Sequence, residues 1–266
     1  MANFIKKSIV AGVLVSASSV VSAATLTAGG IEWDTVPING VQGTTGTVDF
    51  QQWFSDGSYG VGADGQSTVT ASSNGSVGVG PGGYLTGVGL FSGLSDGRGK
   101  DDPSFCVDGD DSCELTFAFG GLLSLPDGSF DSSNAWLNVY FDNSPDFGRR
   151  NSTSYQKYAE AQDGDLWASF DITGFSYIPF DPANPFDRGG SDVFLNIVGG
   201  NSDVIDIFDN GSLRDIFFTA SAQFRGAEYS AVGTGEISTV STPATLGLFG
   251  LALFGLGVAS RKRIAK

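Results

Sequence analysis

Hydrophobic and polar side chains alternate with a period of two along much of this 266-residue chain. In the clearest case, Leu115, Phe117 and Phe119 are separated by a threonine and an alanine. Period two over five to eight residues is typical of a strand that buries one face. The same alternation recurs at residues 136–141, 166–172, 193–197 and 218–224.

Weaker β-like runs precede these segments, at residues 47–54, 67–71 and 84–91. Asp-Gly and Asn-Gly pairs between the runs are typical turn sequences. Only residues 152–161 have a pattern that favours a short helix. About eight to twelve short strands with turns between them predict an all-β fold, as an antiparallel β-sandwich or a jelly-roll-like domain.

The N-terminal segment has the three parts of a secretory signal peptide. Lys6 and Lys7 precede an apolar run at residues 9–21, and small residues follow at Ser22 and Ala23. This order predicts export and cleavage that removes residues 1–23. A membrane anchor is the alternative, but 13 residues make about 20 Å of helix, which is shorter than the roughly 30 Å of a bilayer core.

The C-terminal segment combines an uncharged apolar stretch with a basic end. Residues 244–259 would form about 24 Å of helix, enough for a short transmembrane span. Arg261, Lys262 and Arg263 follow within the basic end 261–266 and would stop the span on the cytoplasmic side. A buried core helix is the alternative. The expected division is a signal peptide (1–23), an exported β domain (24–239) and a tail (240–266).

The start of this tail reads Ser241, Thr242, Pro243, Ala244, Thr245 and Leu246. Together with the apolar span and the basic end, it resembles the PEP-CTERM sorting signal of Gram-negative bacteria, with Ser-Thr-Pro in place of Pro-Glu-Pro. The resemblance implies an exosortase-type transpeptidase as partner, with cleavage near Pro243. It also implies export across the inner membrane, then membrane anchoring, then a place at the cell surface or in an extracellular polysaccharide matrix. Segments 30–34, 113–117, 136–140 and 163–167 are similar to exoproteins of that group.

Composition narrows the chemistry that the chain can perform. The sequence contains no histidine, which excludes a Ser-His-Asp triad, a Cys-His pair and histidine-ligated metals. Its net charge is −15, and loss of both ends would remove six of the 14 basic residues and no acid, giving −21. A strongly acidic domain disfavours nucleic acid and anionic lipid as partners.

Cys106 and Cys113 are the two cysteines, and an isolated pair in an exported chain predicts a disulfide. Two thiolates on a metal are the alternative. Asp108, Asp110 and Asp111 lie between the cysteines. Carboxylates on turns are ligands that Ca²⁺ takes, so the loop is a candidate calcium site, although it lacks the EF-hand pattern, and Asp-Gly also simply makes turns.

Three aromatic residues are candidates for ligand binding. Trp136 and Tyr140 fall on the strand face opposite Leu137 and Val139, and Trp167 has the same phase in its own strand. Rings on a sheet face can stack on sugars, and the alternative is that they pack under a loop.

Two hypotheses for function follow. The first is a non-enzymatic protein of the cell surface or matrix, sorted through its tail and binding polysaccharide, with no catalytic residues. The second is a secreted glycoside hydrolase or other hydrolase that uses a carboxylate pair, for which Glu114 precedes the clearest strand but has no identifiable partner.

Overall fold

The computed structural model describes residues 25–34, 36–38, 41–55, 83–95, 106–107, 113–147, 154–178, 189–224 and 231–240. The predicted signal peptide, the tail from residue 241 onward and the three loop aspartates lie outside these residues. Among the described residues, no helix combines the length and the hydrophobicity required to cross a membrane.

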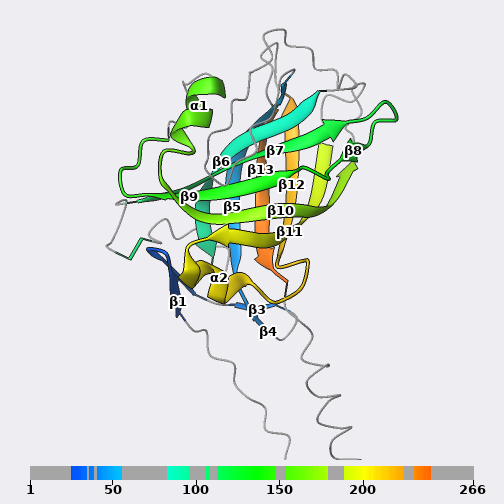
Figure 1. The fold of residues 1–266 in the computed structure, drawn as a ribbon. Helices are drawn as coiled ribbons and strands as arrows, with labels where there is room; N and C mark the ends of the chain where they lie inside the picture. Colours follow the sequence, from blue (N-terminus) through cyan, green and yellow to red (C-terminus); the bar gives the residue numbers. More distant parts are fainter. Residues whose placement is uncertain are drawn as a thin grey trace, which may run out of the picture.

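Strands make up most of the described chain (Figure 1). The short N-terminal strands are β1 (Thr25–Ala28), β2 (Ile31–Asp34), β3 (Val36–Ile38) and β4 (Val41–Gly43). The next are β5 (Thr45–Ser55), β6 (Tyr84–Ser95), β7 (Glu114–Ser124), β8 (Phe130–Asp131) and β9 (Trp136–Asp142). Helix α1 (Ser154–Glu160), β10 (Asp165–Ile178), β11 (Gly189–Gly200), α2 (Ser202–Phe208), β12 (Ile216–Phe224) and β13 (Ala231–Thr239) complete the order.

The long strands form one antiparallel sheet that closes on itself. The strands are hydrogen-bonded in the order β5, β6, β7, β9, β10, β11, β12 and β13. The sheet closes because β13 pairs back with β5. The predicted all-β, antiparallel class is confirmed. Within the described residues the arrangement is an up-and-down barrel, whereas a sandwich or jelly roll would split the strands between two sheets. Closure leaves no long strand with an unpaired edge.

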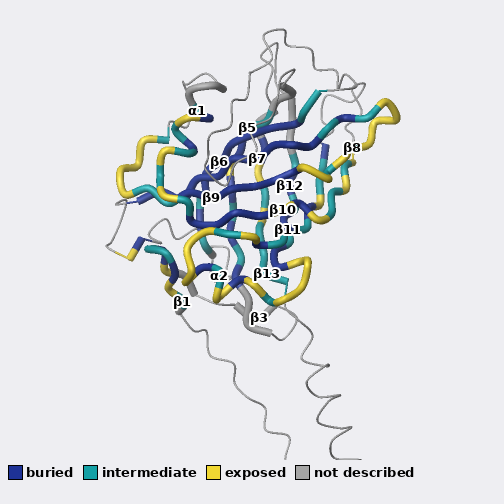
Figure 2. Tube along the Cα trace, in the orientation of Figure 1, coloured by how far each residue is buried: buried dark blue, intermediate teal, exposed yellow. Residues whose placement is uncertain are grey.

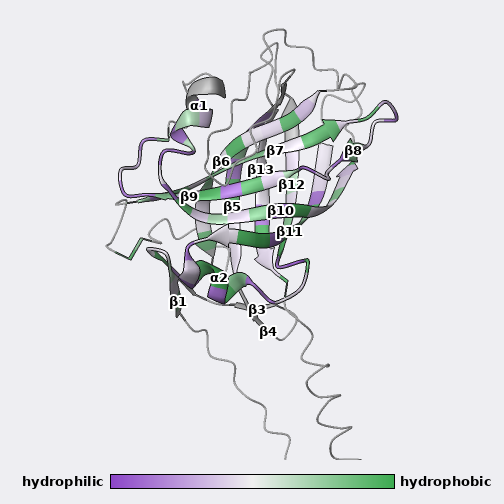
Figure 3. Ribbon diagram, viewed as in Figure 1, coloured by the Kyte–Doolittle hydropathy of each residue, from purple (hydrophilic) through white to green (hydrophobic). Residues whose placement is uncertain are grey.

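Phenylalanine rings pack against one another inside the barrel, together with leucine, isoleucine and valine side chains. Phe117 packs edge-to-face on Phe218 and Phe91, with ring centroids 6.5 and 5.9 Å apart, and Phe218 packs on Phe50 at 6.4 Å. The buried positions follow the strands and the exposed ones gather in the connections (Figure 2). Several of the most hydrophilic stretches also lie in the connections (Figure 3). Predicted alternation therefore corresponds to an inward apolar face and an outward mixed face.

The two ends of the barrel differ, and we call them the capped end and the open end. At the capped end the β1–β2 hairpin and α2 lie against the strands, with Ile31 and Val204 completely buried. The chain enters β5 and leaves β13 at this end, where Thr239 N donates to Thr44 O over 3.1 Å. The other end, where β5, β10 and β12 finish, is named the open end only because the described residues place no helix against it.

One of the two described helices was predicted from the sequence and the other was not. Helix α1 confirms the helix expected within residues 152–161. Helix α2 was not predicted, although Asn201 is a typical N-cap and its side chain accepts a hydrogen bond from Asp203 N. Val204 and Phe208, four residues apart, bury one face of α2 against the barrel.

We expect Gly89→Ala to lower the free energy of unfolding by about 1–3 kcal/mol, because overpacking a filled core has that cost. An added Cβ at Gly89 would overlap the Phe117 ring and lie 2.6 Å from Asp49 O. Urea unfolding of the purified variant measures the change. Gly199→Ala is the matched control, since its Cβ would meet only Ser169 Cβ at 3.8 Å. Equal unfolding midpoints for the two variants would contradict this account of the core.

Candidate functional site

The disulfide is the first predicted feature that the structure places. Cys106 and Cys113 are bonded, with their Cα atoms 5.9 Å apart, so the predicted bridge is confirmed and neither sulfur is free for a metal. Cys106 also forms a β-bridge with Ile31, and Val107 N donates to Gly30 O over 3.1 Å. The bond therefore joins the β1–β2 hairpin to the start of β7. Closing so short a loop contributes about 2–3 kcal/mol in the chain-entropy model.

An acidic cluster lies directly beside this disulfide. Glu114 follows Cys113 at the start of β7 and stands opposite Asp142 of β9 in the strand register. Asp146 completes the group, and one carboxylate oxygen from each of the three lies within 4.8 Å of the others. Strand pairing thus gives Glu114 the acidic neighbours that its sequence position alone did not reveal.

Backbone donors hold the buried member of the cluster. Glu114 is only 6% exposed, and its carboxylate accepts hydrogen bonds from Asp146 N at 3.2 Å and Phe147 N at 3.1 Å. Asp142 Oδ1 accepts from Ser144 N at 2.8 Å. These bonds shape the turn after β9, so the carboxylates of Glu114 and Asp142 have a structural task there.

Burial and mutual repulsion make it unfavourable to ionise the carboxyl groups at this place in the folded protein. Burial raises the pKa of Glu114 above its ordinary value of 4.5, repulsion by Asp146 and Asp142 adds to the rise, and the two backbone donors oppose it. Burial also raises the pKa of Asp163, followed by repulsion from Asp146 and Asp142. The folded protein therefore binds protons at this end more readily than the unfolded chain does.

The cluster has oxygen chemistry of the kind that hard cations accept. The calcium prediction, however, concerned Asp108, Asp110 and Asp111, which lie outside the described residues and stay a prediction. As a hydrolytic pair the cluster is unfavourable, because catalytic carboxyl groups stand about 5–10 Å apart with a sugar between them. The oxygens here are closer, and Glu114 is turned toward backbone N–H groups.

Trp136 and Tyr140 do lie on the outer face of β9, as the alternation predicted, but they are covered. Their exposed fractions are 7% and 3%, and they pack with Tyr158 and Ala161 at the end of α1. Tyr140 Oη donates to Gln162 Oε1 over 3.3 Å. The alternative given for this pair, packing under another part of the chain, is therefore what the structure shows, since the α1 segment covers the face that a stacked sugar would need.

Trp167 is also buried, and for a different reason. A register shift between Leu166 and Ala168 interrupts the alternation of β10 and turns Trp167 into the main core. Its ring packs on Phe208 with centroids 5.7 Å apart, and Nε1 donates to Ala28 O over 3.3 Å. Trp167 seals the capped end, so the sequence assignment of this residue to the outer face is corrected.

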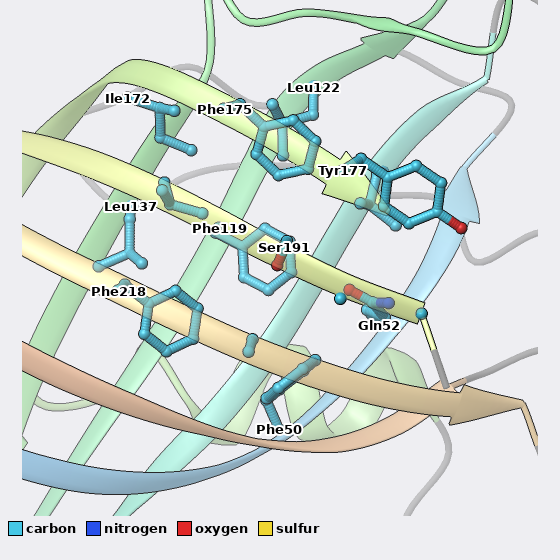
Figure 4. A pocket seen from close by; sticks show the side chains of 15 residues that line it. Phe50, Gln52, Phe119, Leu122, Leu137, Ile172, Phe175, Tyr177, Ser191 and Phe218 are labelled. Atoms are coloured by element: carbon cyan, nitrogen blue, oxygen red, sulfur yellow. The ribbon is translucent and has the colours of Figure 1, made fainter. Parts of the chain in front are cut away.

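The described residues line, among others, two small cavities of about 40 Å³ each inside the barrel. The one at the capped end is lined by Trp167 and Phe208 among others. The one at the open end is lined by Phe119, Phe175 and Leu122 together with the polar residues that Figure 4 shows near the strand ends. A void of this size costs roughly 1 kcal/mol at about 24 cal/mol per Å³. Sequence periodicity predicts Phe119 as an inward residue but gives no sign of the cavities.

Comparison of the chain with protein-family models, with curated proteins and with solved structures finds no match in any of the three. The class that the described residues themselves define is an eight-stranded up-and-down barrel with one end capped by a disulfide-tied hairpin and a helix.

The pKa of Glu114 predicts a specific pH dependence. Because the folded value is raised, the contribution of this group to stability is complete below about pH 4.5 and is lost as the pH rises through the folded value. We therefore expect Glu114→Gln to become more stable relative to wild type as the pH rises above 4.5. Urea unfolding at a series of pH values between about 4 and 7 measures the difference.

Glu236→Gln, at an exposed position on β13, provides the matched control. The Glu114 prediction is wrong if the stability difference between wild type and Glu114→Gln does not change across that pH series. Glutamine keeps a carbonyl oxygen that can accept from Phe147 N, so the comparison isolates the charge.

Proposed function

We propose that this protein is an exported, non-enzymatic component of the cell surface or extracellular matrix, sorted through its C-terminal tail. The observation that carries the proposal is the Cys106–Cys113 disulfide, because such bonds persist in oxidising compartments and are rare in the cytosol. The signal-like N-terminus and the apolar tail with its basic end point in the same direction.

The place where the chain leaves the barrel supports a tethering role for the tail. Asp215, 1% exposed, accepts hydrogen bonds from Ile197 N at 2.9 Å and Asn210 N at 3.0 Å. Asp215 O accepts from Val240 N at 2.8 Å, and Asn210 Nδ2 donates to Val240 O at 2.8 Å. The last described residue before the sorting motif is therefore fixed at the capped end.

This geometry gives the tethered protein an orientation. A span over residues 244–259 begins only a few residues after Val240, so a membrane would lie beyond the capped end. The open end of the barrel would then face away from the membrane. That orientation would leave the open end free to contact material outside the cell.

Several features favour a binding or structural role over the hydrolase alternative. The chain has no histidine, the walls of the barrel cavities are mainly apolar, and Glu114 is engaged by backbone donors. Calcium on the disulfide loop and polysaccharide as a partner are proposed from the sequence and from the resemblance of the tail.

We expect protein recovered from the outer fraction of an exosortase-bearing host to lack residues 1–23 and the segment after the cut near Pro243. Intact-mass measurement detects both losses, and thiol labelling without reduction should leave Cys106 and Cys113 unmodified.

A variant in which Gln replaces Arg261, Lys262 and Arg263 should be retained less well at the inner membrane, because the positive residues hold the end of the span on the cytoplasmic side. Exported protein that keeps residues 244–266 would rule out sorting by cleavage.

Polysaccharide binding is tested separately with the processed protein. We expect retention on immobilised extracellular polysaccharide of the host, and no retention on an unrelated neutral glucan. Because the mature domain would carry a charge of −21, binding to an acidic polysaccharide should need divalent cations and be lost in chelator. Absence of retention on host polysaccharide, with and without Ca²⁺, would remove this partner while leaving the sorting proposal intact.

A further inference from the structure

Large apolar side chains are exposed to solvent near the capped end of the barrel. Leu213, in the turn between α2 and β12, is 72% exposed, and Val198, near the end of β11, is 53% exposed. Ile207 of α2 is exposed as well. All three belong to residues 189–224, a stretch that the structure describes without a gap. Single exposed apolar residues are ordinary, whereas a group of them on one surface indicates a place of contact.

Two phenylalanine rings extend this apolar surface along the outside of the barrel. Alternation along β11 places Phe194 on the same outer face as Val198, and Phe217 of β12 stands opposite Phe194 in the strand register. Both rings are half-buried, and their centroids are 5.2 Å apart. Thr173 Oγ1 of β10 lies 2.7 Å from Leu213 O and 3.3 Å from Phe194 O, so the exposed turn adjoins this face.

Arg214 adds a cation to the apolar surface. Its guanidinium carbon lies 4.4 Å from the centroid of the Phe194 ring, and its side chain forms no ion pair with another described residue. An arginine stacked on a ring keeps N–H donors at its edge, and their planar arrangement suits a phosphate group. We call the following five residues the β11–β12 corner: Phe194, Val198, Leu213, Arg214 and Phe217.

The exit of the tail determines what the corner faces. Asn210 Nδ2 donates to Arg214 O over 3.0 Å and to Val240 O over 2.8 Å, so the turn that carries Leu213 also holds the last described residue. Figure 1 shows the end of β13 and the turn after α2 together at the capped end. The apolar segment 244–259 begins four residues later, and four residues span at most about 14 Å. A bilayer that holds this segment therefore lies close to Leu213.

We propose that the β11–β12 corner docks on the surface of the bilayer in which the tail is embedded. Leu213 and Val198 enter the boundary between head groups and acyl chains, the exposed edges of the two rings lie beside them, and Arg214 binds a lipid phosphate. The partner is a zwitterionic lipid surface, because an anionic one would repel the acidic domain. This inference rests on the tethering part of the proposed function and adds which side of the barrel the membrane touches.

Quenching by nitroxide lipid tests the contact in the protein with its tail. Because Cys106 and Cys113 are bonded to each other, Leu213→Cys provides a free thiol for the fluorescent dye NBD. The labelled protein is reconstituted into phosphatidylcholine vesicles that contain a phosphatidylcholine with a nitroxide near the head-group end of one acyl chain. We expect the nitroxide lipid to remove most of the emission of this label. A label on Ile178→Cys, 63% exposed at the opposite end of the barrel, should keep its emission.

Flotation of the vesicles separates the docking inference from the proposal on which it rests. Protein that does not float with the vesicles has no tether, and the tethering proposal and this inference then fail together. If the protein floats but the Leu213 label is quenched no more than the Ile178 label, the docking inference alone is overturned. An unquenched Leu213 label whose emission shifts to the blue as protein density rises shows a second copy on the corner, which also overturns it.

Variants of the labelled protein identify the residues in contact. Val198→Asp should lower the ratio of docked to undocked protein about tenfold, equivalent to about 1.4 kcal/mol, because a carboxylate is disfavoured at the acyl boundary. Ile178→Asp, the same change at the opposite end, is the matched control and should leave quenching unchanged. Thermal unfolding checks the fold of each variant, and Arg214→Gln provides the test if Val198→Asp does not fold. Unchanged quenching in the folded variant used overturns the proposal.

Discussion

The closed sheet depends on placing phenylalanine rings over glycines in neighbouring strands. Gly89 of β6 stands opposite Phe117 of β7 in the register, and Gly233 of β13 stands opposite Phe50 of β5. In both pairs the ring occupies the volume that a Cβ on the glycine would need. An eight-stranded barrel has an interior only wide enough for side chains to fill, so large rings on one strand require small residues on the next. The high glycine content of this chain is thus partly a packing requirement.

These Phe–Gly pairs also explain why the strands form one closed sheet instead of two stacked sheets. Glycine without a side chain lets adjacent strands twist strongly, and register shifts in β5, β6 and β10 add local curvature. The first strand of the barrel, β5, then pairs with the last, β13, along eight positions from Thr45 to Gln52. Long strands that coil in this way bury their inner faces against one another, and a second sheet is not needed.

Sequence periodicity predicted the long strands except β13, with most of their inward residues, because that signal is local. The further run predicted at residues 67–71 lies outside the described residues. Closure of the barrel depends on which distant strand pairs with β5. The alternation of hydrophobic and polar residues contains no information about that pairing. Trp167 shows the same limit at one residue, since the register shift beside it reverses its face. The outer positions of Trp136 and Tyr140 were assigned correctly, but their cover by the α1 segment is a tertiary contact that no strand pattern contains. Likewise, Glu114 meets Asp142 only through the β7–β9 register.

The asymmetry of the barrel ends links the fold to the proposed role. Stabilising elements are concentrated at the capped end, where the disulfide, the β1–β2 hairpin, α2 and the hydrogen bonds around Asp215 meet the entry and exit of the chain. In the proposed arrangement the tethered end bears any pull on the protein, and its links to β7 and β13 would resist that pull. The open end is then left without such reinforcement among the described residues. Binding elements are commonly drawn from the less stable parts of a fold, so the proposed contact with extracellular material fits the open end better than the tethered one.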